Sequence, residues 1–232
     1  MRNANRRCLF VLFVASLMVT GPDVAEAKNP WQAGFSRVVI TPNQPMFASG
    51  YGGRNKPTAG KIHDLYVRAA VLRDPTGHTV LFLSMDLIGI HPAMANVVIH
   101  HAAKKYGLAR KDVMLCCSHT HCGPALDSKL SHMLALKKSD WVRIRQYQTR
   151  LNALLVSAVD RAMKDVKPAI LSTGIGRTTF AVNRRKPIGK GPTDHDVPVL
   201  RATSIDGTKV RGVIFGYACH NTTLSFYNWC GD

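Results

Sequence analysis

The sequence predicts an α/β protein in which a mixed β-sheet, or two packed sheets, is flanked by helices. Short segments with strand patterns are interrupted by two longer segments whose apolar residues recur at helical spacing. One pair of strand patterns lies early in the chain and another lies late, and each pair is separated by a turn sequence. This mixture of helices with two hairpins is typical of a mixed sheet.

The first part of the chain predicts three strands. The first covers 35–41 and ends at a proline. Residues 42–60 are then rich in glycine, proline and asparagine, which suits either the rim of a pocket or an ordinary flexible loop. Apolar residues alternate over 65–71 and 79–85, and the turn sequence at 74–77 joins these two segments into a hairpin.

A helix is expected over 92–106, because a proline stands in its first turn and Gly107 follows its last apolar position. His100 and His101 are expected on the surface of this helix. A short apolar strand should follow over 112–118.

The longest amphipathic pattern begins at Ser139, a suitable N-cap, and continues to Lys167. Three strands are expected beyond it, over 169–180, 197–203 and 210–219. The last two form the second hairpin.

Residues 1–27 read as a secretory signal peptide. Arginines precede the apolar segment 8–19, and Ala25-Glu26-Ala27 offers small residues for signal peptidase. We therefore expect an exported protein whose folded part is 28–232, secreted or periplasmic. An uncleaved membrane anchor is disfavoured, because the apolar segment is short.

The formal net charge of +17 favours anionic partners such as phospholipid headgroups or acidic polysaccharide. Nucleic acid is not expected, since none of the usual recognition motifs is present.

Five cysteines remain after the signal peptide, so they cannot all pair within one chain. Export permits a bridge such as Cys219 to Cys230, but no regular disulfide spacing is present. Cys122 and Cys219 flank candidate metal ligands, although their spacing fits no zinc finger or ribbon.

The segment 118–124, Ser-His-Thr-His-Cys-Gly-Pro, follows the strand expected over 112–118. Because strand side chains alternate, His119 and His121 are expected to point to the same side. Neutral imidazole is a good zinc ligand, and a strand end is a stiff and accessible mount for it. A hydrogen-bonded structural pair is the alternative. His220 also follows an apolar strand.

Three further places are weaker candidates. His63 lies beside the glycine-rich segment, either at the rim of a site or on a surface loop. Asp86 either orients a ligand histidine or simply ends a strand. Asp194, His195 and Asp196 are adjacent in a loop, and we expect a turn there rather than a metal site.

The order of the motifs resembles the N-terminal domain of neutral/alkaline non-lysosomal ceramidases. The matching segments are 33–42, 50–52, 62–69, 84–86, 118–124, 183–184 and 217–223. The resemblance implies a ceramidase N-terminal-like fold and a zinc-dependent amidohydrolase that cleaves the N-acyl bond of ceramide or a related lipid amide. It implies that His119 and His220 bind Zn²⁺, that His121 contacts the substrate or transition state, and that Arg184 orients or polarises the substrate.

The chain departs from the family pattern in two ways. Arg185 and Lys186 stand where serine and proline are usual, which leaves a different amide or ester substrate open. The family's glutamate and tyrosine zinc ligands, expected after His220, are not found within 232 residues. We therefore expect an N-terminal portion of a longer enzyme, which by itself binds zinc weakly and has little activity. A non-catalytic exported binder of anionic lipid or polysaccharide is the alternative function.

Overall fold

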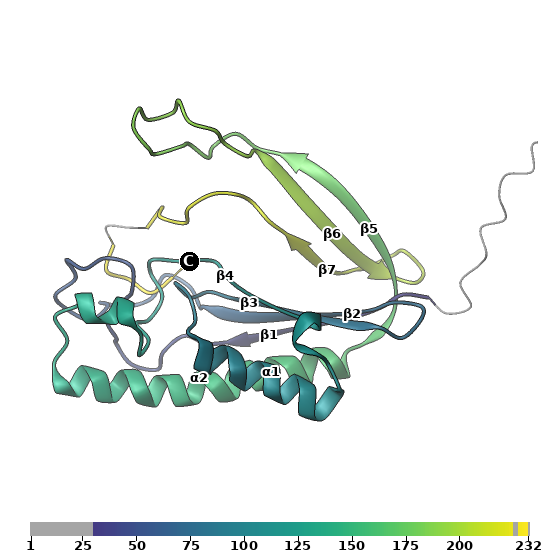
Figure 1. Ribbon diagram of the computed structural model, residues 1–232, viewed down its shortest axis with the longest axis horizontal. Coiled ribbons are helices and arrows are strands. Elements are labelled where there is room, and N and C mark those ends of the chain that lie inside the picture. The colour runs from purple at the N-terminus through teal and green to yellow at the C-terminus, as the bar shows by residue number, and fades with distance from the viewer. Residues whose placement is uncertain (1–29, 225–226, 232) are drawn as a thin grey trace, which may run out of the picture.

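The fold is built on one seven-stranded sheet with the strand order β4-β3-β2-β1-β5-β6-β7. It is described by a computed structural model that covers residues 30–224 and 227–231 (Figure 1). The expected signal peptide, 1–27, lies outside the described residues. The strands are β1 (Gln32–Val39), β2 (Tyr66–Arg73), β3 (Thr79–Met85), β4 (Val113–Cys117), β5 (Lys167–Arg177), β6 (Asp196–Ser204) and β7 (Val210–Phe215).

Strands β1 to β4 form the first leaf of the sheet. β1 pairs antiparallel with β2, and β2 with β3, whereas β4 lies parallel to β3. The parallel pair needs a crossover, which α1 (Pro92–Tyr106) supplies. The mixed sheet and the early hairpin are therefore confirmed.

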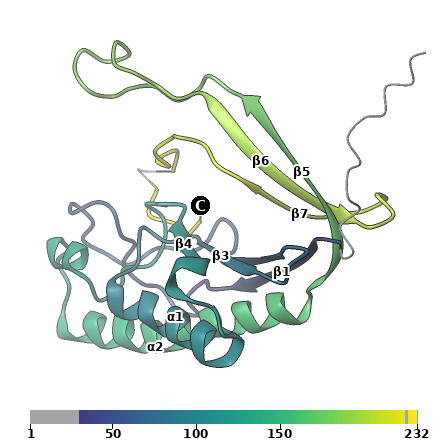
Figure 2. The same cartoon turned by 45° about the vertical axis from the view of Figure 1, so that its right-hand side comes forward.

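Strands β5 to β7 form a second leaf, which rises away from the first in Figures 1 and 2. Only two residue pairs join β1 to β5, Gln32 with Pro168 and Ala33 with Lys167. Within this leaf β5, β6 and β7 are all antiparallel neighbours, so the late hairpin is also confirmed. The continuous sheet thus contains two leaves, which is why the sequence was compatible with either one sheet or two.

Both long helices cover the same face of the first leaf (Figure 1). The second of them, α2 (Lys138–Lys164), packs against β1 and β2. Its apolar stripe, which includes Leu151 and Leu155, is fully buried with Leu81 and Leu83 of β3. A smaller apolar cluster lies where the two leaves meet. Most of the buried core therefore lies beneath the first leaf.

Several local expectations are wrong, most of them at the ends of elements. β1 covers 32–39 rather than 35–41, and β5 covers 167–177 rather than 169–180. α2 begins before Ser139, because the Asp140 carboxylate accepts the N–H of Lys137 and so caps the helix there. β7 ends at Phe215 rather than at residue 219. His101 is not simply a surface residue, since its Nε2 lies 2.6 Å from Asp160 of α2.

Two short 3₁₀ turns, η1 (Arg110–Asp112) and η2 (Lys129–Met133), had no clear sequence signal. Among the described helices, none is long and apolar enough to cross a membrane.

Candidate metal centre

The first histidine of the motif lies just beyond β4. The N–H of Ser118 donates to Met85, and the N–H of His119 donates to Leu87, so the chain still follows the extension of β3. His119 itself has a φ of +60°, in the left-handed region. Strand alternation therefore does not apply here, and the expected reason for His119 and His121 sharing a side is wrong. Their ring centroids nevertheless lie 5.1 Å apart.

The ring of His119 is held by one backbone group. Its Nδ1 lies 2.7 Å from the carbonyl oxygen of Ile88, a contact in which the imidazole N–H donates. A neutral ring with its proton on Nδ1 has a free lone pair on Nε2. Metal-binding histidines are commonly oriented in this way.

The glycine-rich segment holds His121. Gly50 has a φ of +100°, and a Cβ there would lie 2.4 Å from Nδ1 of His121. The Tyr51 ring packs 4.7 Å from the imidazole, and Arg54 donates to the carbonyl oxygens of His121 and Ser49, at 2.7 and 3.1 Å. These contacts favour the interpretation of this segment as the rim of the candidate site over that of an ordinary flexible loop.

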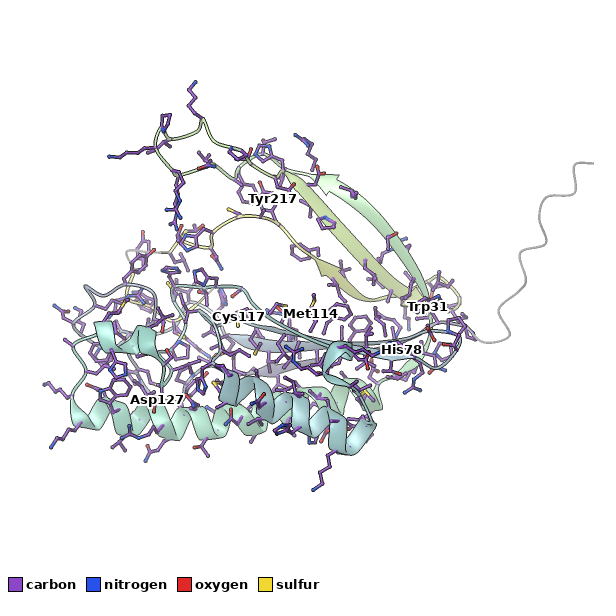
Figure 3. All side chains as sticks on the ribbon, viewed as in Figure 1. Trp31, His78, Met114, Cys117, Asp127 and Tyr217 are labelled. Atoms are coloured by element: carbon purple, nitrogen blue, oxygen red, sulfur yellow. The ribbon has the colours of Figure 1, made fainter. Side chains whose placement is uncertain are left out.

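His220 reaches the site along the segment that follows β7. The hydroxyl of Tyr217 accepts the N–H of Ala181 at 3.0 Å and donates to the carbonyl of Thr178 at 3.2 Å. These bonds tie the segment after β7 to the segment after β5. Tyr217 is labelled in Figure 3. Arg184 and His220 are thereby carried together toward the motif that follows β4.

All four predicted site residues meet at one place. Nε2 of His220 lies 3.0 Å from Nε2 of His121, and the His119 and His220 rings are 5.0 Å apart. Nη1 of Arg184 lies 3.0 Å from Nδ1 of His220. His121 is buried, His220 half-buried, and His119 and Arg184 exposed, so the cluster is open on one side.

The three histidines could hold one metal ion. One ligand nitrogen from each ring lies within 4.8 Å of the others. Two nitrogens that bind a tetrahedral zinc are roughly 3.3 Å apart, so small side-chain rotations would bring these donors into range. The geometry is compatible with His121 as a third ligand and also, as the family resemblance implies, with His121 as a contact for the substrate.

Electrostatics favours the neutral rings that a metal requires. Burial lowers the pKa of His121 below its ordinary value of 6.5, and the neighbouring His220 and His119 lower it further. Burial also lowers the pKa of His220, and the Arg184 guanidinium adds to that effect. Both imidazoles therefore stay unprotonated to a lower pH than a free histidine.

Arg184 and a metal bound at Nε2 would require different tautomers of His220. Because the guanidinium can only donate, Nδ1 of His220 is the acceptor, and the ring proton is then on Nε2. A metal bound at Nε2 would require the proton on Nδ1, so Arg184 would have to release the ring. His119 fits a metal as it stands, whereas His220 fits once Arg184 has moved.

The weaker candidates lie outside this cluster. His63 is exposed, and its Nδ1 contacts the carbonyl of Asp64. The buried Asp86 accepts the N–H of Tyr66 at 2.8 Å and pairs with Arg68 at 2.6 Å, so it fastens the ends of two strands. These contacts support the strand-terminator interpretation of Asp86.

The loop 194–196 forms the expected turn, because the N–H of Asp196 donates to the side chain of Asp194. His195 contacts the carbonyl of Ala181 instead of joining a metal cluster. None of the five cysteines in the described residues is joined in a disulfide, so the permitted bridge from Cys219 to Cys230 is not formed.

Sequence reasoning missed Tyr51, Arg54 and the Ile88 carbonyl as parts of the site. The Gly-Tyr-Gly motif at 50–52 was a signal for the first, whereas nothing local distinguishes Arg54 or Ile88. A cavity of about 490 Å³ lies near Thr41 and Arg150, and none of the site histidines lines it.

Known proteins are similar to this chain in sequence and in fold. The family model for neutral/alkaline non-lysosomal ceramidase, N-terminal, matches residues 31–230. The structure of neutral ceramidase from Pseudomonas aeruginosa is similar with a TM-score of 0.73 at 22% identity, over 88% of this chain and 34% of that one. A ceramidase complexed with C2 is similar with a TM-score of 0.72 at 21% identity, over 88% of this chain and 33% of that one.

The two solved structures support the fold, and this chain spans about a third of their length. The family match covers nearly all of the described residues, including the three histidines and Arg184. The chain therefore belongs to the neutral/alkaline non-lysosomal ceramidase family, in which it matches the N-terminal domain.

Proposed function

We propose that this protein is an exported zinc-dependent amidohydrolase that cleaves the N-acyl bond of ceramide or a related lipid amide. The observation that carries the proposal is the convergence of His119, His121, His220 and Arg184, which come from three separate segments of the chain. Family membership supports the reaction class. The residue pattern of segment 1–27 supports export.

An amide needs help at two points, because its carbonyl is a poor electrophile and its amine is a poor leaving group. When bound by His119 and His220, zinc supplies Lewis acidity, which makes the carbonyl more electrophilic and water a better nucleophile. Both histidines are ligands of the type that zinc prefers, and an open coordination position is typical of catalytic sites.

The remaining side chains have distinct tasks. His121 is neutral and fixed between Gly50 and Tyr51, so its Nε2 is positioned to exchange a proton or a hydrogen bond with the reacting amide. Arg184 carries a permanent charge and a planar set of donors. Once it has left His220, its guanidinium can bind the carbonyl oxygen, where negative charge develops in the transition state.

The decisive experiment measures hydrolysis of N-acylsphingosine by the full-length protein and by its His119→Ala and His220→Ala variants. Each substitution removes a ligand nitrogen, so activity and bound zinc, measured by elemental analysis, should fall together. His100→Ala is the matched control, because His100 lies exposed on α1, outside the metal cluster. Full activity in the two site variants would exclude the proposed chemistry.

A non-catalytic binder of anionic lipid or polysaccharide is the second candidate, and the net charge of +17 favours it. Such a binder would be indifferent to loss of His119 or His220 and sensitive to salt. A panel of other lipid amides and esters, assayed with the same variants, tests whether Arg185 and Lys186 admit a different substrate.

A further inference from the structure

The segment between β5 and β6, residues 178–195, projects from the molecule as a long loop. In Figures 1 and 2 it extends beyond the ends of its two strands, away from the helices and the first leaf. We call this segment the β5–β6 loop. Long loops with no secondary structure of their own are uncommon in compact domains and are often functional.

Basic residues predominate in this loop, and its acidic residue, Asp194, lies at its end. Four basic residues lie in it and no acidic residue occurs between 178 and 193; the basic residues are Arg184, Arg185, Lys186 and Lys190. Among its apolar side chains Phe180 is 69% exposed, Val182 62% and Ile188 69%. Large apolar side chains exposed within a cluster of like charges are costly in water alone, which indicates a surface for a partner.

Hydrogen bonds within the loop give its tip a defined shape. The side chain of Asn183 donates to the carbonyl of Pro192 at 2.8 Å and accepts the N–H of Arg185 at 3.0 Å. The N–H of Gly189 donates to the carbonyl of Asn183 at 2.9 Å. Asn183 therefore closes the base of the tip, and little ordering is required when a partner binds.

The tip is continuous with the candidate metal centre. Arg184, which contacts His220, immediately precedes Arg185 and Lys186. Any surface that the tip binds would therefore lie close to the histidine cluster. A substrate that resides in a bilayer would have a short path to the site.

We propose that the tip of the β5–β6 loop docks on a bilayer that contains anionic phospholipids. Ile188 enters the region between the headgroups and the acyl chains, while Arg185, Lys186 and Lys190 contact phosphate groups. Basic residues around an exposed apolar side chain are the composition of interfacial membrane anchors. A polysaccharide would bind the charges but gain nothing from Ile188. The idea that the bilayer carries the substrate rests on the proposed function. Binding of the loop to an anionic bilayer does not.

The test is sedimentation of the full-length protein with vesicles of phosphatidylcholine alone or of phosphatidylcholine with about 30 mol% anionic phosphatidylglycerol. No amide lipid is added, and the measurement is repeated in the His119→Ala variant, so that binding is separated from hydrolysis. Lys186→Gln/Lys190→Gln removes two charges and should weaken binding to the anionic vesicles by roughly tenfold or more. Ile188→Ser should weaken it by about tenfold.

The matched controls lie at the other end of β6 and on a helix. Ile205 is 57% exposed in the β6–β7 turn, so Ile205→Ser removes a similar side chain from a distant place. Lys104→Gln/Lys209→Gln removes the same charge, and both controls should stay within about twofold of the parent protein, by the usual size of surface substitutions. Circular dichroism checks that each variant is folded.

Three results would overturn the proposal. The first is equal binding to neutral and anionic vesicles, and the second is loss of binding in the controls to the same degree as in the loop variants. The third is a loop variant that loses retention on heparin while its vesicle binding is unchanged, since the loop would then be a polysaccharide site. Loss of vesicle binding only in the loop variants, with salt sensitivity in the parent, supports the proposal.

Discussion

Gly50 offers a direct test of how the glycine-rich segment positions His121. In Gly50→Ala the new Cβ would lie 2.4 Å from Nδ1 and 2.6 Å from Cγ of the imidazole. Ordinary contacts begin at 3.4 Å, so the ring or the loop has to shift by about 1 Å. The φ of +100° adds a second penalty, because side chains rarely adopt that backbone conformation.

Two contributions set the magnitude. The left-handed backbone costs ~1–2 kcal/mol for a residue other than glycine. The crowding of a packed ring costs a further ~1–3 kcal/mol. A loss of about 2–5 kcal/mol in the free energy of unfolding corresponds to a fall in Tm of roughly 4–20 °C for a domain of this size.

Gly53→Ala is the matched control, because an added Cβ there has no atom within 4 Å and its φ is ordinary. Thermal unfolding followed by circular dichroism compares the two variants, and isothermal titration compares their affinities for zinc. Gly50→Ala should lower Tm, and it should also lower zinc affinity because the displaced His121 ring disturbs the proposed zinc ligand His220, whose Nε2 lies 3.0 Å from that of His121. Equal Tm and equal zinc affinity in the two variants would refute this account of the segment.

Three other predictions concern the same region and the junction between the leaves. Arg184→Gln removes a charge that lowers the pKa of His220 and repels a cation. The pKa of His220, followed by NMR titration, should therefore rise, and zinc binding should tighten severalfold. Weaker zinc binding would contradict this. The folded-state pKa values of His121 and His220 lie below 6.5, so the unfolded chain takes up protons first as the pH falls. The free energy of unfolding of the metal-free protein, measured in urea, should therefore decrease below about pH 6.5. A His121→Gln variant should show a smaller decrease. Gly212→Ala should lower Tm, because its Cβ would lie 2.3 Å from the Phe35 ring between the two leaves, and Phe35→Leu should restore part of the loss; an additive double variant would argue against the clash.

Local patterns in the sequence determined much of the secondary structure. β3 and α1 have the predicted bounds, because alternation, a first-turn proline and a terminal glycine act over a few residues. Both hairpins could also be predicted from the sequence. The order of the motifs could be read there as well, and it indicated the family. The end of β7 could not be predicted, since the apolar pattern continues past Phe215 although strand pairing stops there.

The site required the tertiary structure. His119 and His220 are distant in the chain, and their approach depends on the two-residue junction between β1 and β5 and on the hydroxyl of Tyr217. The left-handed turn at His119 and the close approach of Gly50 also arise from packing between distant segments. The sequence by itself determined which side chains were suited to bind a metal. Only long-range pairing decided that they meet. The entropic cost of closing such long loops is offset by contacts between segments that are distant in the sequence, and no local pattern predicts those contacts.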